Sequence, residues 1–216
     1  MKIGIIGTGA VGKMLGTKMT ELGHEVKMGS RTANNEKAAE WAKAAGAKAS
    51  QGTFADAAAF GEMVFNCTRG EVSMQALNAA GAKNLDGKIL VDVANPLDFS
   101  KGMPPTLTPS LANTHSLGEE IQKAFPAARV VKALNTMNCS LMVNPKLVDG
   151  SHDLFMCGND ITAKVAVANL LEQFGWSEVI DLGDITSSRA TEMLLPIWIR
   201  LMMKYQTPNF NFKIVK

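Results

Sequence analysis

The stretch MKIGIIGTGAVG, Met1–Gly12, decides the fold. Its first part, Lys2–Ile6, is a short apolar run typical of a strand that is buried on both faces. Its second part, Gly7–Gly12, has the spacing G-x-G-x-x-G and leads into a predicted helix over Val11–Leu22, which Gly23 ends. Because the glycines follow a strand and open a helix, they indicate a dinucleotide-binding turn. The alternative is a glycine-rich turn without a ligand.

Each glycine of this turn has a separate physical role. Gly7 makes the tight turn, Gly9 lacks a Cβ and lets the backbone approach a pyrophosphate, and Gly12 lets the helix pack closely on the sheet. The free N–H groups of the turn then lie at the positive end of the helix, where they can bind phosphate. The predicted cofactor-binding residues here are Gly7, Thr8, Gly9, Ala10, Val11 and Gly12.

Length and composition limit the classes of protein. A chain of 216 residues can form one large α/β domain or two small ones. A net charge of +2 with 19% charged residues argues against a broad nucleic-acid or membrane surface. Three cysteines far apart suggest buried free thiols, and neither a disulfide framework nor a zinc site. With no signal segment before the first strand and no apolar run of about 18 residues, we expect a cytoplasmic protein.

The end of the second predicted strand, His24–Gly29, indicates which dinucleotide is bound. An acidic residue at this position binds the ribose 2′-hydroxyl of NAD, whereas an arginine accommodates the 2′-phosphate of NADP. No Asp or Glu occurs from residue 26 to residue 35, and Ser30, Arg31 and then Lys37 are found instead. The sequence therefore predicts NADP(H) as the cofactor, bound by these three residues. As alternatives, Arg31 and Lys37 are ordinary solvated charges.

Strands and helices alternate along most of the chain. Further strands are predicted over Ala47–Ser50, Glu62–Cys67, Ile89–Val93 and Arg129–Leu134, and helices over Asn35–Ala45, Thr53–Phe60, Ser73–Ala80 and Ser116–Phe125. This alternation favours an α/β fold with a doubly wound, Rossmann-like parallel sheet, whose right-handed crossovers bring the strand exits to one edge. We expect a ligand crevice there, lined by Thr68, Arg69, Asn95, Pro96, Asn135 and Thr136. Arg69 could hold an anion or simply be exposed.

The remaining segments suggest a second unit. The loop over residues 98–114 is either a functional cover or disordered. Two strands, Leu154–Cys157 and Glu178–Asp181, surround a helix over Ile161–Phe174, and a last helix spans Ala190–Tyr205. We expect an NADP-binding domain over residues 1–150 and a small C-terminal α/β lobe over residues 151–216, which together could count as one domain. The alternating tail, residues 209–215, favours a homodimer contact or an edge strand of the same chain.

Few residues suit chemical catalysis. The three histidines are isolated, no G-x-S-x-G turn occurs, and no cluster has metal-ligand spacing. Direct hydride transfer between two flat rings needs positioning in a dry cleft rather than an acid or a base. We therefore predict no catalytic residue and no metal.

Five motifs together resemble the coenzyme F420-dependent NADP oxidoreductase family. They are KIGIIGTGAVG, GSR with Glu36-Lys37, ANPL at 94–97, RVVKALNT at 129–136 and SSRATEMLLP at 187–196. The resemblance implies hydride transfer between NADP(H) and a 5-deazaflavin. It implies that Asn95-Pro96 and Asn135-Thr136 flank the nicotinamide, and that residues 189–195 help to shape the acceptor pocket.

The exit of the fourth strand departs from the family pattern. Members that use the deazaflavin tend to have an apolar-Pro-Trp exit, whereas this chain has Asn66–Gly70. A flavin, a quinone or a small carbonyl is therefore an alternative acceptor. A redox-sensing NADP(H) module without turnover is a further alternative. An imine or β-hydroxyacid reductase usually has a longer helical region than the one that this chain provides.

Overall fold

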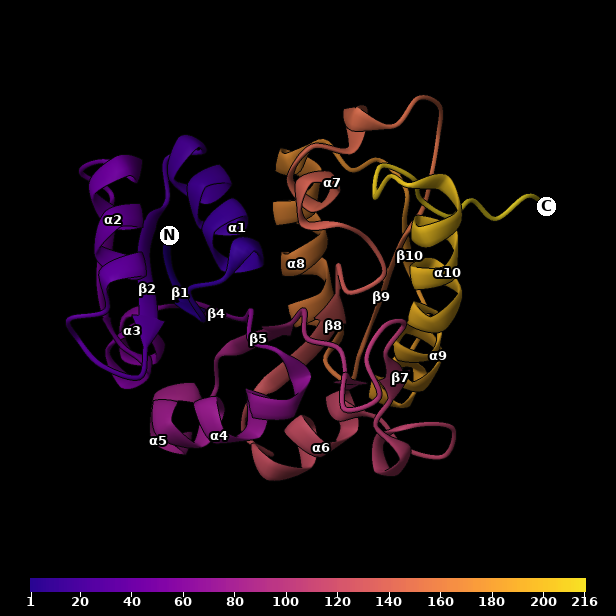
Figure 1. Cartoon of the computed structure of the whole chain (residues 1–216). Coiled ribbons are helices and arrows are strands. Elements are labelled where there is room, and N and C mark those ends of the chain that lie inside the picture. The colour runs from indigo at the N-terminus through magenta and orange to yellow at the C-terminus, as the bar shows by residue number, and fades with distance from the viewer.

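The computed structural model describes residues 1–216, which form an eight-stranded sheet between two layers of helices (Figure 1). The strands are β1 (Lys2–Ile6), β2 (Glu25–Ser30), β3 (Ala49–Thr53), β4 (Met63–Asn66), β5 (Ile89–Asp92), β8 (Arg129–Ala133), β9 (Leu154–Gly158) and β10 (Val179–Asp181). Their order is β10-β9-β8-β5-β4-β1-β2-β3. The α/β, Rossmann-like prediction is confirmed.

The sheet has a parallel part and a short antiparallel end. Strands β1 to β5 and β8 are parallel to one another, whereas β9 pairs antiparallel with β8, and β10 is parallel to β9. Strands β4 and β5 are buried along their whole length, as expected for strands with helices on both faces. The last two strands lie where the sequence predicts them, and they extend the same sheet.

Helices cover both faces of the sheet, and the sheet separates two apolar cores. One face carries α1 (Ala10–Glu21), α2 (Glu36–Ala45), α7 (Cys139–Val143) and α8 (Ile161–Phe174). The other carries α3 (Phe54–Phe60), α4 (Gly70–Ala80), α5 (Ala82–Leu85) and α6 (Leu117–Ala124). Helix α2 is anchored by Trp41, whose ring lies so near Gly16 that a Cβ there would approach it to 2.7 Å. Close packing of α1 on α2 therefore requires a glycine at this position.

Polar side chains fix the starts of four helices. The side chains of Asn35, Thr53, Ser116 and Asp160 each accept a hydrogen bond from a backbone N–H in the first turn of the helix that follows. These caps satisfy donors that otherwise lack a partner within the helix. The helix starts predicted at these four residues are confirmed to within one or two positions.

The C-terminal region differs from the sequence prediction in two places. The predicted single helix over residues 190–205 is two helices, α9 (Ser188–Met193) and α10 (Leu195–Tyr205). The break follows from Pro196, which has no N–H to donate to the preceding turn. The tail over residues 209–215 forms no strand. It accepts one backbone hydrogen bond from the neighbouring segment, from Asp153 N to Phe212 O at 2.9 Å. Its rings pack on α10 instead, with Phe210 stacked on Trp198 at 5.3 Å between centroids.

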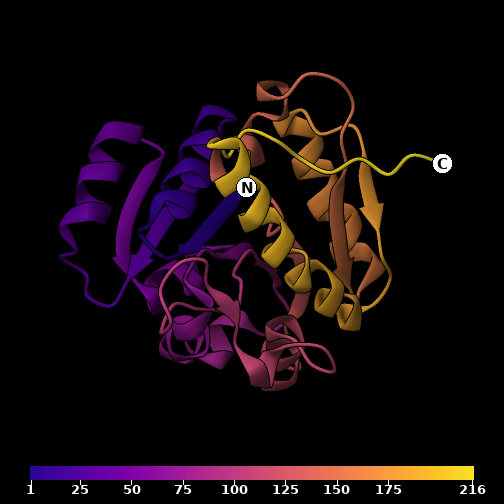
Figure 2. The ribbon, with the colours of Figure 1, turned by 45° about the vertical axis from the view of Figure 1, so that its right-hand side comes forward.

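Short elements complete the chain. The predicted loop over residues 98–114 contains part of a two-stranded hairpin, β6 (Leu97–Asp98) with β7 (Thr106–Leu107), and the 3₁₀ helix η1 (Pro109–Leu111). Two more 3₁₀ helices are η2 (Pro145–Leu147) and η3 (Ile185–Ser187). Figure 2 shows α10 outside the layers that cover the sheet, with the tail leading away from its end. None of the helices combines the length and apolar character that crossing a membrane requires.

Candidate active site

Backbone bonds hold neighbouring strand exits together at one edge of the sheet. Gly7 N donates to Gly29 O at 3.1 Å and so joins the exits of β1 and β2. The exit of β4 joins that of β1 through Cys67 N and Ile6 O, 2.9 Å apart. The side chain of Asn95, after β5, donates to the backbone oxygen of Asn135, after β8, at 2.8 Å. The exits that the sequence places at one crevice therefore do lie along one edge.

The glycine turn is shaped to receive an anion. Gly7 has φ +123°, and a Cβ there would lie 2.8 Å from Cys67 O, so both its conformation and its surroundings require glycine. At Gly12 a Cβ would lie 2.4 Å from Gly7 O. Gly9 faces open space, with no atom within 4 Å of the position of its missing Cβ. The first turn of α1 has no acidic residue and no side-chain cap, so its N–H groups and positive dipole are available to a pyrophosphate.

The predicted 2′-phosphate end lies at the exit of β2. Ser30 is buried, and its hydroxyl donates to Thr32 O at 2.5 Å while its oxygen can still accept. Arg31 and Lys37 are exposed, and neither forms an ion pair within the chain. Two cations without partners beside the glycine turn suit the 2′-phosphate of NADP(H).

The predicted nicotinamide end consists of two amides. Asn135 donates through Nδ2 to Asn95 Oδ1 at 2.9 Å, and Asn95 Nδ2 returns the bond to the Asn135 backbone oxygen. Asn135 Oδ1 is buried and accepts no hydrogen bond. An unsatisfied buried acceptor costs free energy, so this oxygen suits a donor such as the carboxamide N–H of nicotinamide. Pro96 and Thr136, which directly follow these two amides, are both buried.

Leu134 bends the chain into this pair. Its φ of +66° is left-handed, a conformation that costs a leucine about 1–2 kcal/mol. The turn directs the chain from the end of β8 to Asn135, immediately after it. Strain of this kind is kept only where the surroundings impose it.

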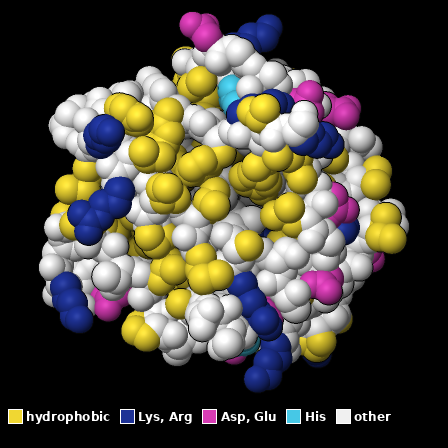
Figure 3. Space-filling view, turned by 90° about the vertical axis from the view of Figure 1, so that its right-hand side faces the viewer, with side chains coloured by type: hydrophobic (Ala, Val, Ile, Leu, Met, Phe, Trp, Pro, Cys, Tyr) yellow, Lys and Arg dark blue, Asp and Glu magenta, His cyan; other side chains and the backbone are white.

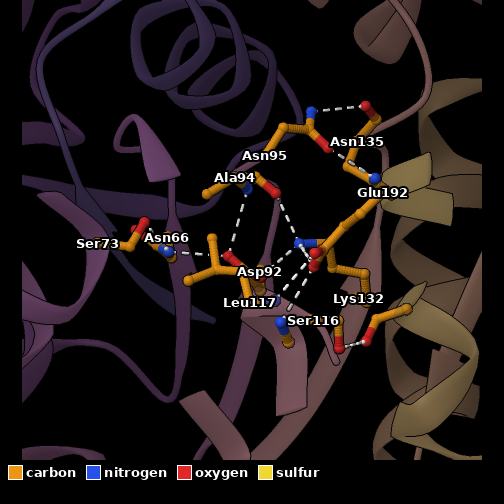
Figure 4. Close-up of polar contacts among 12 residues, drawn as sticks. Asn66, Ser73, Asp92, Ala94, Asn95, Ser116, Leu117, Lys132, Asn135 and Glu192 are labelled. Atoms are coloured by element: carbon orange, nitrogen blue, oxygen red, sulfur yellow. Dashed lines mark hydrogen bonds and ion pairs between the residues drawn. The ribbon is translucent and has the colours of Figure 1, made fainter. Parts of the chain in front are cut away.

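A buried polar network, Asn66–Ser73–Asp92–Lys132–Glu192, underlies the two amides (Figure 4). The Lys132 ammonium lies 2.7 Å from Asp92 Oδ2 and 2.7 Å from Glu192 Oε1, and it donates to Ala94 O at 2.6 Å. Asp92 also accepts from Asn66 Nδ2 at 2.8 Å, and Asn66 in turn contacts Ser73. The network thus joins β4, α4, β5, β8 and α9.

Charges in this network perturb one another. Burial alone would lower the pKa of Lys132, but Asp92 and Glu192 outweigh it and raise that pKa, so Lys132 stays an ammonium. Burial raises the pKa of Glu192, and Lys132 offsets part of the shift. Glu192 also accepts from the N–H groups of Leu117 and Gly118, at 2.9 and 3.0 Å, at the start of α6. Its carboxyl group therefore fastens α9 to both a strand and a helix.

Thr68 and Arg69, predicted to bind the cofactor, have other contacts in this structure. The Thr68 hydroxyl donates to Asn66 Oδ1 at 2.7 Å and belongs to the edge of the buried network. Arg69 is 73% exposed and pairs with Glu71 at the start of α4. Their cofactor contacts remain predictions.

The cysteines are not placed for nucleophilic work. Burial raises the pKa of Cys67, and it raises that of Cys157 to about 12, so both stay neutral thiols. Cys139 is only half-buried, which corrects the expectation that all three are buried. It begins α7 and packs against the larger core.

Sequence reasoning missed the buried network, although a signal for it was present. Asp92 and Lys132 interrupt the apolar strands ILVDV and RVVKAL. Because a fully buried parallel strand is not in contact with solvent, a charged residue within it needs a partner of opposite charge. Two opposite charges at the same depth of neighbouring strands could have been paired; in the sheet they are register partners. The sequence around Glu192 gives no comparable signal, because this residue does not interrupt an apolar strand.

The fold and these strand exits define a class, the proteins with a Rossmann-type dinucleotide-binding fold. The family model described as NADP oxidoreductase coenzyme F420-dependent matches residues 2–96. An F420-dependent NADP reductase of Methanocaldococcus jannaschii is 30% identical over 99% of this chain and 98% of its own length. The chain therefore belongs to the coenzyme F420-dependent NADP oxidoreductase family.

Two further relatives extend this picture. A crystal structure from Arthrobacter sp. FB24, of a protein provisionally assigned as an F420-dependent NADP reductase, has a TM-score of 0.94 and 53% identity, with both chains fully covered. Metalloreductase STEAP3 of Rattus norvegicus is 32% identical over 91% of this chain. The match spans only 38% of the length of the metalloreductase. The same fold therefore also occurs as part of a larger reductase.

Proposed function

We propose that this oxidoreductase transfers a hydride between NADP(H) and a 5-deazaflavin of the coenzyme F420 type. The observation that carries the proposal is the end-to-end similarity to the F420-dependent NADP reductase of Methanocaldococcus jannaschii, which covers the strand exits as well as the glycine turn. The assignment of the acceptor rests on this similarity. The residues given to each part of the cofactor rest on the geometry of the chain.

In this proposal the chain acts by binding and orientation. The N–H groups from Thr8 to Val11 hold the pyrophosphate, and Ser30, Arg31 and Lys37 hold the 2′-phosphate. Asn135 Oδ1 would accept a hydrogen bond from the carboxamide, and Asn95 holds Asn135 in place, so the pair would restrict how the nicotinamide binds. NADPH supplies the hydride itself. Hydride donation by the nicotinamide ring requires no proton exchange between that ring and a side chain at the strand exits.

Deazaflavin reduction by NADPH tests the acceptor. We expect the absorbance of the oxidised deazaflavin to be lost only when protein and NADPH are both present, and NADH to be much less effective. A flavin, a quinone and a small carbonyl compound serve as parallel acceptors. Turnover with one of these and none with the deazaflavin would reject the proposed acceptor and retain the reductase. NADPH binding without turnover of any acceptor would favour a sensing module.

We also propose that two copies associate through the α9–α10 face. Figure 3 shows apolar side chains gathered around a hollow at the centre of this face. Met193 of α9 and Ile197 and Tyr205 of α10 are 39%, 53% and 57% exposed, so both helices present apolar side chains to solvent. Light scattering should give twice the chain mass, and Ile197→Glu should give the mass of one chain. A monomeric wild-type protein at micromolar concentration would contradict the dimer.

A further inference from the structure

The Lys132 ammonium and its two carboxylates are buried completely, with side-chain exposures of 0%, 0% and 1%. Burying an ion pair seldom gains stability over apolar residues of the same volume, because desolvation offsets the attraction. A specific arrangement is the better explanation for such a group. The contacts of the group show which part of the chain it arranges.

Both polar backbone groups of Ala94 bond to this network. Ala94 N donates to Asp92 Oδ1 at 3.2 Å, and Ala94 O accepts from Lys132 Nζ at 2.6 Å. Ala94 lies beyond the end of β5. Side chains therefore hold the peptide groups on both sides of this residue, immediately before Asn95.

Lys132 also belongs to the strand that leads to the second amide. It lies in β8, two residues before the left-handed Leu134 and three before Asn135. One side chain thus ties the exit of β5 to β8. The reciprocal bonds between Asn95 and Asn135, at 2.8 and 2.9 Å, depend on the position of one strand exit relative to the other.

We propose that Lys132, held by Asp92 and Glu192, is a positioning residue for the nicotinamide end. It fixes the Ala94 carbonyl, and through it sets Asn95 against Asn135 so that Asn135 Oδ1 faces the carboxamide. Glu192 carries the same restraint to α9, which begins the C-terminal helical face. This inference rests on the proposed binding of NADP(H), and it adds a residue that the cofactor does not touch.

The test uses the intact protein and two ligands, NADPH and 2′,5′-ADP, which lacks the nicotinamide half. Lys132→Met alone would strand two buried carboxylates, so the test variant is Asp92→Asn/Lys132→Met, which leaves the formal charge of the network unchanged. Asp92→Asn alone keeps acceptors for Ala94 N and Asn66 and keeps Lys132 on the Ala94 carbonyl. It serves as the reference.

We expect the double variant to bind NADPH about tenfold more weakly than Asp92→Asn, the scale of one lost charged hydrogen bond. It should also lose the change in emission that binding causes in the reduced nicotinamide. Binding of 2′,5′-ADP should stay within about twofold. Asp92→Asn/Lys132→Gln keeps an N–H donor at this position and should recover part of the NADPH affinity.

A matched control comes from the other buried lysine. Lys164 contacts Asp181 at 2.7 Å and donates to Gly183 O at 3.0 Å, so Lys164→Met/Asp181→Asn removes a lysine–aspartate pair that involves β10 and whose aspartate is 48% exposed. It should leave both ligands unaffected. Unchanged NADPH affinity and emission in the folded Lys132 variant would overturn the proposal, as would equal losses for the two ligands. A wild-type protein that binds 2′,5′-ADP and not NADPH would overturn it too, whereas one that binds neither would refute the proposed function itself.

Discussion

The two ends of the cofactor crevice are built in opposite ways. At the proposed 2′-phosphate end, the charged groups are exposed cations on a strand exit and a helix start, and the hydroxyl of Ser30 beside them is buried. At the nicotinamide end the facing groups are neutral amides, and the charges lie one layer deeper, in the buried network. In the proposed function, the first end would recognise a charge and the second would hold the nicotinamide ring in one orientation.

This difference separates affinity from geometry. A solvated cation can be removed without disturbing the fold, because water replaces its contacts. A buried ammonium cannot, because its carboxylates are then left unpaired. Substitutions at the first end should therefore change which cofactor binds, and substitutions at the second end should change how the nicotinamide lies.

Gly9→Ala should give the largest effect, because it acts on the pyrophosphate between the two ends. Gly9 has φ −77°, which alanine tolerates, and a Cβ would meet no atom of the chain. We expect an unchanged melting temperature and a loss of NADPH affinity of about 100-fold, because the added methyl group pushes the phosphates away from the N–H groups. Calorimetric titration beside thermal denaturation measures both. Gly12→Ala, whose Cβ would lie 2.4 Å from Gly7 O, should instead lower the melting temperature.

Arg31→Ala should abolish the preference for NADPH over NADH. Loss of a charged contact of about 1.5–3 kcal/mol predicts NADPH affinity lower by about 10- to 100-fold, with NADH affinity unchanged. Side-by-side fluorescence titrations give the ratio. Lys43→Ala, which removes an exposed charge from the other end of α2, is the control and should change neither. An Arg31 variant that still prefers NADPH would refute the assignment of this end.

Asn135→Asp should change the balance between the two redox forms of the cofactor. A carboxylate near the ring stabilises the cationic oxidised nicotinamide, so NADP⁺ should gain about tenfold in affinity relative to NADPH. The ratio of the two dissociation constants, followed as the pH is raised, reports it, because burial at this position raises the pKa of the new carboxyl group above its ordinary value. Asn78→Asp, on the exposed side of α4, should leave the ratio alone. An unchanged ratio in both variants would place the nicotinamide elsewhere.

The smallest expected effect lies behind the nicotinamide end, where Glu119 of α6 accepts from Arg189 Nε of α9 at 2.8 Å. The bond to Arg189 holds the pKa of Glu119 below its ordinary value. A lowered folded pKa adds stability above the unfolded pKa, and this stability is lost as the pH falls through the folded pKa. Glu119→Gln should melt about 2 °C below wild type at pH 7, with the difference vanishing at acidic pH. A difference independent of pH would indicate packing instead.

Sequence patterns captured the features that local chemistry decides. The glycine turn, the helix caps at Asn35 and Ser116, and the cationic exit of β2 are short-range features, in which each residue type has a nearby physical reason. The parallel arrangement of the strands followed from the alternation of strand and helix. The positions of Ser30 and Arg31 at the exit of β2 could therefore be predicted from the sequence alone, whereas their contacts with a 2′-phosphate stay a prediction.

Features set by tertiary packing were not captured. Leu134 adopts a left-handed conformation that nothing in its own sequence favours, because the surrounding exits impose it. Glu192 sits in a helix whose docking on α6 decides that its carboxylate is buried. The tail alternates like a strand, yet its rings find a better surface on α10.

The span of the buried network also bears on synthesis. Asp92 meets Lys132 forty residues later in the chain, and the network is not complete until Glu192 has been made. A nascent chain that has reached β8 can already pair its parallel strands, but Lys132 then lacks one of its two counter-ions. The segments of the glycine turn and the exit of β2 lie within the first 37 residues, whereas the buried network needs residues as far along the chain as Glu192.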